Sequence, residues 1–142
     1  MTPHEIRLVR KSFELVRPIS CQVAALFVDK LVERDAELAG RLSDELGDQG
    51  DRLVALLDHI LAHLDRPAEL ATRLHAKGCR IGPGISDAQH RVVGAVLIDT
   101  LAAAIGVVFT PAVRGAWASL VRDVSTALRA GAAETLAMAE AA

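Results

Sequence analysis

Three short polar signatures, each just ahead of an apolar stretch, constrain the possible folds of this chain more than any other feature. The first, Thr2–Glu5, combines a hydroxyl N-cap, a proline in the first turn and a glutamate that reaches back to the cap. Ser86 and Gln89 form a second capping box, and Thr110–Pro111 repeats the pairing of N-cap and proline. All three are typical of helix starts, so we predict a helical chain.

The residues between these signatures have helical periodicity. In the first segment, apolar residues recur three to four positions apart from Ile6 to Val16, which predicts a helix that buries one face. Further helices are predicted over residues 20–38, 48–64, 67–77, 86–109 and 111–128. We expect Gly78 to end the helix at 67–77, and "GPG" at 82–84 to form a turn. No segment alternates convincingly as a strand would, so the fold class is all-α.

Composition indicates one soluble domain over residues 1–142, with an Ala-rich extension at 130–142 that continues the last helix or frays. The net charge of −2 gives no reason to expect a nucleic-acid partner. No apolar run reaches the ~18 residues of a membrane span, so we expect no membrane partner. The N-terminus has no apolar signal-peptide core, which predicts a cytoplasmic protein. Two cysteines, Cys21 and Cys79, are expected to be reduced thiols.

The order of these elements resembles the bacterial single-domain globins, the kind also fused in flavohaemoglobins. The most specific piece is "VVGAVLIDTLAAAIGVVFTPAVRGAWASLV" at 92–121, and "GDQGDRLVALLDHILAHLD" at 47–65 is similar to the long helix on the distal side. The similarity covers Ile6 to Leu128. It implies a globin-like three-over-three helical fold around a flat pocket, with haem b as the cofactor.

The resemblance also implies which positions would line that pocket. Gln49 corresponds to the distal glutamine, while Val28 takes the place of a distal tyrosine. Leu42 takes the place of the aromatic residue that stacks on haem. The proximal histidine corresponds to Arg80, or to Ile81 if one counts forward from Gln49. The usual proximal histidine is therefore missing.

Three nearby side chains are candidate axial ligands in its place. His75 precedes the expected position by one to two helical turns and is the favoured ligand, although it would also suit an exposed helix end, where a cation complements the helix dipole. Cys79 and His90 are the alternatives; Cys79 would otherwise be a small buried residue, and His90 a residue in a first helical turn near solvent. If the Arg80 side chain pointed into the pocket, its positive charge would favour a bound anion and disfavour a ferric haem.

Two functions follow from these observations. The first is a haem protein with an altered pocket that binds or senses a diatomic gas, O2 or NO, or performs redox chemistry; its slot would be formed by Val28, Leu42, Leu53, Leu57 and Val93, with Gln49 on the distal side. The second is a haem-free regulatory or dimerisation module, a homodimer, that holds another apolar ligand such as a fatty acid. The sequence contains no hydrolase or transferase motif, so enzymatic activity is limited to redox chemistry at a bound haem.

Overall fold

The computed structural model describes residues 1–81 and 84–141, and over these residues the chain is helical with no strand, which confirms the all-α prediction. In chain order the elements are α1 (Pro3–Val16), η1 (Arg17–Ile19), α2 (Ser20–Arg34), α3 (Ala36–Arg41), α4 (Ser43–Leu46), η2 (Asp48–Gly50), α5 (Asp51–Ala62), α6 (Pro67–Ile81), α7 (Asp87–Ile105), η3 (Gly106–Val108) and α8 (Pro111–Ala141).

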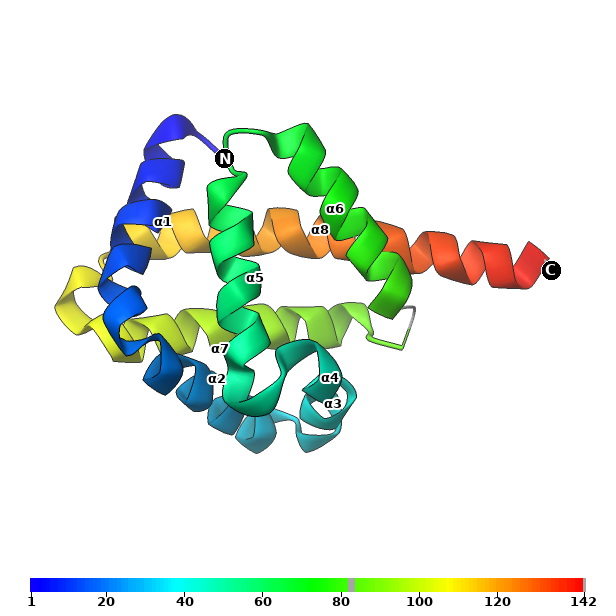
Figure 1. Ribbon diagram of the computed structural model, residues 1–142, viewed down its shortest axis with the longest axis horizontal. Helices are drawn as coiled ribbons and strands as arrows, with labels where there is room; N and C mark the ends of the chain where they lie inside the picture. Colours follow the sequence, from blue (N-terminus) through cyan, green and yellow to red (C-terminus); the bar gives the residue numbers. More distant parts are fainter. Residues whose placement is uncertain (82–83, 142) are drawn as a thin grey trace.

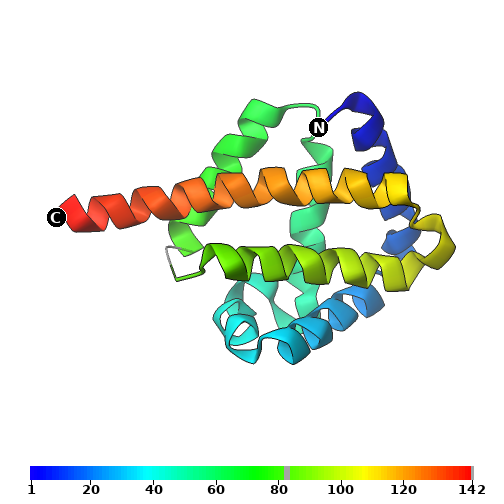
Figure 2. The ribbon, with the colours of Figure 1, turned by 180° about the vertical axis from the view of Figure 1, so that it is seen from behind.

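The helices form two crossed layers (Figure 1). The long helices α7 and α8 lie side by side, and α1, α5 and α6 run across them on one face. Figure 2 shows the same arrangement from behind, with α7 and α8 now in front of α5. Helix α2 also packs against α7. Together these contacts give the globin-like three-over-three fold that the resemblance implied.

The core is built around the single tryptophan. Trp117 of α8 is fully buried and lies against Phe13 of α1, with ring centroids 6.4 Å apart. Its indole Nε1–H donates to the hydroxyl of buried Ser12 at 2.9 Å, and that hydroxyl donates in turn to the Leu8 carbonyl. A second buried cluster surrounds Phe27 and Leu31 of α2.

The three helix starts predicted from local signals are confirmed. The Thr2 hydroxyl accepts from the Glu5 amide at 3.1 Å, and the Glu5 carboxylate accepts from the Thr2 amide. Ser86 and Gln89 make the same reciprocal pair at the start of α7. The Thr110 hydroxyl accepts from the Val113 amide at 3.3 Å.

The prediction that Gly78 ends a helix is wrong. The helix α6 continues to Ile81, and Gly78 is buried within it against α8. A Cβ atom at Gly78 would lie 2.1 Å from the Leu128 carbonyl oxygen, and one at Gly131 would lie 2.0 Å from the His75 carbonyl oxygen. These glycines allow two helix backbones to touch, a tertiary requirement that local C-cap chemistry does not reveal. The predicted turn at 82–84 falls partly on residues outside those described.

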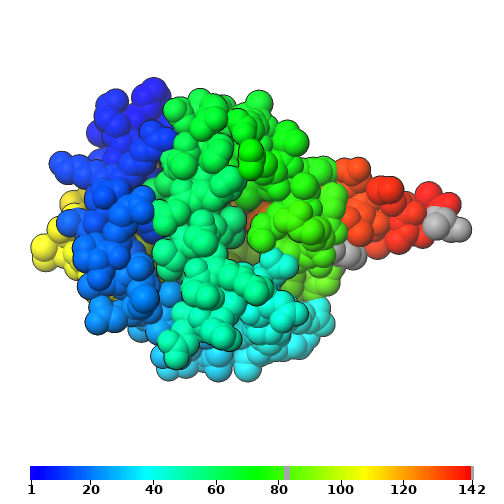
Figure 3. All heavy atoms as spheres, viewed as in Figure 1, coloured from blue at the N-terminus to red at the C-terminus, as the bar shows by residue number. Residues whose placement is uncertain are grey.

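The Ala-rich segment continues α8 well beyond the body of the protein (Figures 1 and 2). The space-filling view shows the same end of the chain standing clear of the other helices (Figure 3). Gly131 and Ala132 are the last buried residues of this helix among those described, and Leu136 and Met138 are exposed.

The segment Asp87–Val108 is long and apolar enough to cross a membrane, judged by length and composition alone. The expectation that no segment has this length and apolarity therefore needs correction. A single such helix is weak support for a span, because the core helix of a soluble protein has the same composition. The absence of a membrane partner stays a prediction.

Candidate functional site

Helices α5, α7 and α8, with Phe27 of α2, line an apolar cavity of about 120 Å³ that is partly open to the surface, which we call the central cavity. His90 and Ser125 are the polar side chains on its wall. The rest of the wall is glycine or apolar, formed by Phe27, Leu53, Leu56, Leu57, Ile60, Val93, Gly94, Leu97, Leu120, Val121, Val124 and Leu128. An apolar wall with a few polar groups is the usual make-up of a small-molecule site.

Four of the residues proposed from the sequence meet at this cavity. Leu53 and Leu57 come from the apolar face of α5, and His90 and Val93 from the first two turns of α7. The capping box at Ser86 sets where α7 begins, and so places His90 in its first turn beside the cavity.

The other predicted pocket residues lie elsewhere. Val28 and Leu42 are half-buried and pack against the second core cluster. Gln49 is exposed in η2, with a φ of 52° that places it in the left-handed region. Arg80 is exposed in the last turn of α6. None of these four side chains forms part of the central cavity wall.

Burial lowers the pKa of His90 below its ordinary value, and the nearby Arg129 guanidinium lowers it further, while Asp87 opposes the shift. The imidazole is therefore held neutral at neutral pH, with one nitrogen available as a donor and the other as an acceptor.

His75 and Cys79, the other candidate ligands, face α8 rather than the central cavity. His75 Nε2 pairs with the Glu134 carboxylate, and Cys79 Sγ donates to the Gly131 carbonyl at 3.2 Å. Helix α6 contributes no described residue to the wall of the central cavity. Sequence reasoning missed Glu134, because it lies 59 residues after His75 and only the packing of α6 on α8 brings the two together.

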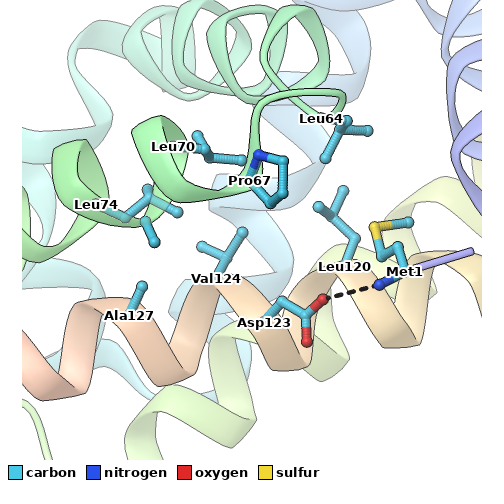
Figure 4. A pocket seen from close by; sticks show the side chains of 10 residues that line it. Met1, Leu64, Pro67, Leu70, Leu74, Leu120, Asp123, Val124 and Ala127 are labelled. Atoms are coloured by element: carbon cyan, nitrogen blue, oxygen red, sulfur yellow. Dashed lines mark ion pairs between the residues drawn. The ribbon is translucent and has the colours of Figure 1, made fainter.

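A second cavity, of about 190 Å³, lies between α6 and α8 (Figure 4). We call it the α6–α8 cavity. Pro67, Leu70 and Leu74 of α6 face Val124 and Ala127 of α8 across it. The Met1 amino group and the Asp123 carboxylate pair at its edge, 3.6 Å apart. Leu120 and Val124 contribute to both cavities and so lie between them.

The fold and its apolar cavities define a helical domain of the globin type. Comparison with known families agrees, because the globin family profile matches residues 34–128. The chain belongs to the globin family. A search of curated proteins found no match.

Members of this family commonly hold haem, but the described residues do not fit one. The central cavity, at about 120 Å³, is smaller than the ~300–1,000 Å³ of sites for much smaller ligands than a porphyrin. The adjoining α6–α8 cavity is also small, at about 190 Å³. The histidine on the central wall, His90, comes from α7, and the imidazole of His75 on α6 is turned to Glu134.

Proposed function

We propose that this globin-family protein is a haem-free binding module whose central cavity takes a small apolar molecule. The observation that carries the proposal is the cavity itself: helices α2, α5, α7 and α8 contribute an almost wholly apolar wall, and His90 and Ser125 are its polar groups. This arrangement favours an apolar ligand with room for one polar contact.

The size of the cavity limits the ligand. Apolar cavities of about 150 Å³ in other proteins stay dry and bind a one-ring hydrocarbon or xenon. The central cavity, at about 120 Å³, is close to that size. A single ring or a dissolved diatomic gas is therefore a better match than a long fatty acyl chain, and a smaller molecule replaces the fatty acid expected from the sequence.

The course of α8 supports a regulatory role. Leu120, Val124 and Leu128 form part of the cavity wall, and the same helix continues without interruption into the exposed segment around Met138. A ligand that repositions this wall would move the projecting segment as well, because one continuous helix carries both.

A thermal-shift experiment with toluene tests the binding site. Toluene at saturation should raise the Tm of the native chain, because a ligand that binds only the folded state stabilises it. Val93→Phe fills the cavity and should abolish the shift. Val107→Phe, at a residue that is 96% exposed, is the matched control and should keep it. If toluene leaves the Tm of the native chain unchanged, the central cavity is not such a site.

A haemin titration tests the absence of haem. The purified chain should be colourless, and added haemin should produce no Soret band beyond that of free haemin. A band that saturates at one equivalent and disappears in His90→Ala would overturn the haem-free proposal and assign His90 as the ligand.

A further inference from the structure

We propose that His75, Cys79 and Glu134 form a binding site for one divalent transition-metal ion of the zinc type. The ligand atoms of these three side chains all lie within 4.8 Å of one another. The site is separate from the central cavity, whose wall contains none of the three, and the proposal does not depend on the proposed function.

Two helices bring the three ligands together. His75 and Cys79 are four residues apart on α6, so their side chains share one face of that helix. Glu134 is on α8, three residues after Gly131, and so lies on the face of α8 that meets α6. The close approach at Gly78 and Gly131 sets the distance between the two backbones. The ligands therefore lie where the backbones of α6 and α8 approach each other closely.

Existing contacts already turn the three side chains toward the interface between α6 and α8. His75 pairs with Glu134, and the Cys79 thiol donates to the Gly131 carbonyl at 3.2 Å. The Thr135 hydroxyl donates to the Cys79 backbone carbonyl at 3.1 Å and so also joins the two helices beside the site. Tetrahedral zinc, with bonds of about 2.0–2.3 Å, needs its ligand atoms roughly 3.5 Å apart. Small side-chain rotations would bring the three atoms to that spacing.

The donor set selects the kind of ion. Imidazole nitrogen and thiolate sulfur favour zinc and similar transition metals over Mg²⁺ and Ca²⁺, which prefer oxygen ligands. On binding, the Cys79 S–H bond breaks, the proton passes to solvent and a metal–sulfur bond forms. Thiolate and carboxylate together then neutralise the two positive charges of the ion.

The site is open to solvent. The His75 side chain is 38% exposed and that of Glu134 is 53% exposed, so an ion can enter without unfolding. Three protein ligands leave the fourth tetrahedral position for water, as in zinc sites that exchange a ligand.

Cobalt provides a spectroscopic test on the full chain. Cys21→Ser first removes the other, exposed thiol. In that background, one equivalent of Co²⁺ should produce a cobalt–thiolate charge-transfer band in the near ultraviolet. Cys79→Ser should abolish the band while its hydroxyl keeps the hydrogen bond to Gly131. His75→Ala and Glu134→Gln should weaken Co²⁺ binding by about 10–100-fold or more, and His4→Ala, at an exposed histidine on α1, should not change it.

A second measurement does not depend on the spectrum. Zn²⁺ would tie α6 to α8 and should raise the Tm of the Cys21→Ser chain, and the increase should disappear in Cys79→Ser and Glu134→Gln. Far-ultraviolet circular dichroism would establish that each variant is folded. No band and no increase in Tm, or effects that Glu134→Gln leaves unchanged, would overturn the proposal. Binding of toluene should be the same in Glu134→Gln, so failure of the metal site and failure of the central cavity are distinguishable.

Discussion

At the scale of single residues, the hydrogen bond between Trp117 and Ser12 is the most buried polar contact between distant parts of the chain. Its two residues are 105 positions apart and join α8 to α1. Both are buried, so water cannot replace either partner.

Ser12→Ala should therefore lower the free energy of unfolding by about 1–3 kcal/mol, because it leaves the indole N–H without its acceptor. Urea denaturation measures the change. In a Trp117→Phe background, Ser12→Ala should lower the free energy of unfolding much less, because that chain has no indole N–H to leave unpaired. Thr126→Ala removes an exposed hydroxyl bonded to its own helix and should change stability by less than about 0.5 kcal/mol. If Ser12→Ala lowered the free energy of unfolding equally in both backgrounds, the hydrogen bond to Trp117 would not be the cause.

Two partly buried histidines predict how stability depends on pH. Burial is the main cause that lowers the pKa of both His90 and His59 below 6.5. Below about pH 6.5 the unfolded chain binds protons that the folded chain resists, so stability falls as the pH drops toward the lower, folded pKa. The lowered pKa values of Glu5 and Glu69 act only below about pH 4.5.

The urea midpoint should therefore decrease between pH 7.5 and 5.5. His90→Gln should reduce that decrease, because the group that resists protonation is gone, while His4→Gln, at an exposed residue, should leave it unchanged. An identical pH profile for the native chain and His90→Gln would mean that His90 titrates alike in both states.

At the scale of helices, the pair α6 and α8 depends on two glycines. A Cβ at Gly78 or Gly131 would lie about 2 Å from a backbone carbonyl of the other helix, and backbone cannot rotate away as a side chain can. Gly115 lies in the same helix α8, and a Cβ atom added there would have nothing within 4 Å.

Gly78→Ala and Gly131→Ala should each lower the free energy of unfolding by at least about 3 kcal/mol, because the helices must move apart. Gly115→Ala is the matched control and should raise it by about 0.5–1 kcal/mol, since alanine is the better helix former. Chemical denaturation compares the three variants. If Gly78→Ala raised the free energy of unfolding as much as Gly115→Ala, the close contact between the backbones of α6 and α8 would be absent.

At the scale of the whole molecule, α8 divides into a packed part and a projecting part. The packed part holds Trp117 and Leu120, whereas residues 136–141 are exposed. A helical segment as short as residues 136–141 has little stability in water when nothing packs against it.

Amide hydrogens of residues 136–141 should therefore exchange far faster than those of residues 113–128, as measured by hydrogen exchange with mass spectrometry. A chain that ends at Thr135 should unfold within about 0.5 kcal/mol of the full chain. Slow, concentration-dependent exchange at 136–141 would instead mean that a second copy covers the segment, as in the homodimer considered from the sequence.

The fold could be predicted more fully than the site. Capping residues and apolar periodicity, which act within a few residues of the chain, predicted the all-α class, and the resemblance to globins predicted the three-over-three arrangement. For the site, Leu53, Leu57 and Val93 line the central cavity because they lie on helix faces that turn inward. Gln49 and Arg80 were not placed correctly by resemblance alone, since each lies at a helix end where one turn of difference changes the direction of a side chain.

The sequence by itself determined where three of the helices begin, because the hydroxyls of Thr2, Ser86 and Thr110 act on amides only three residues away. Only the tertiary structure decided the role of Gly78, the size of the central cavity and the meeting of His75 with Glu134. Each of these depends on how closely the helices approach one another. For α6 and α8 that distance is set by contacts between residues 50 or more positions apart, which no local pattern encodes.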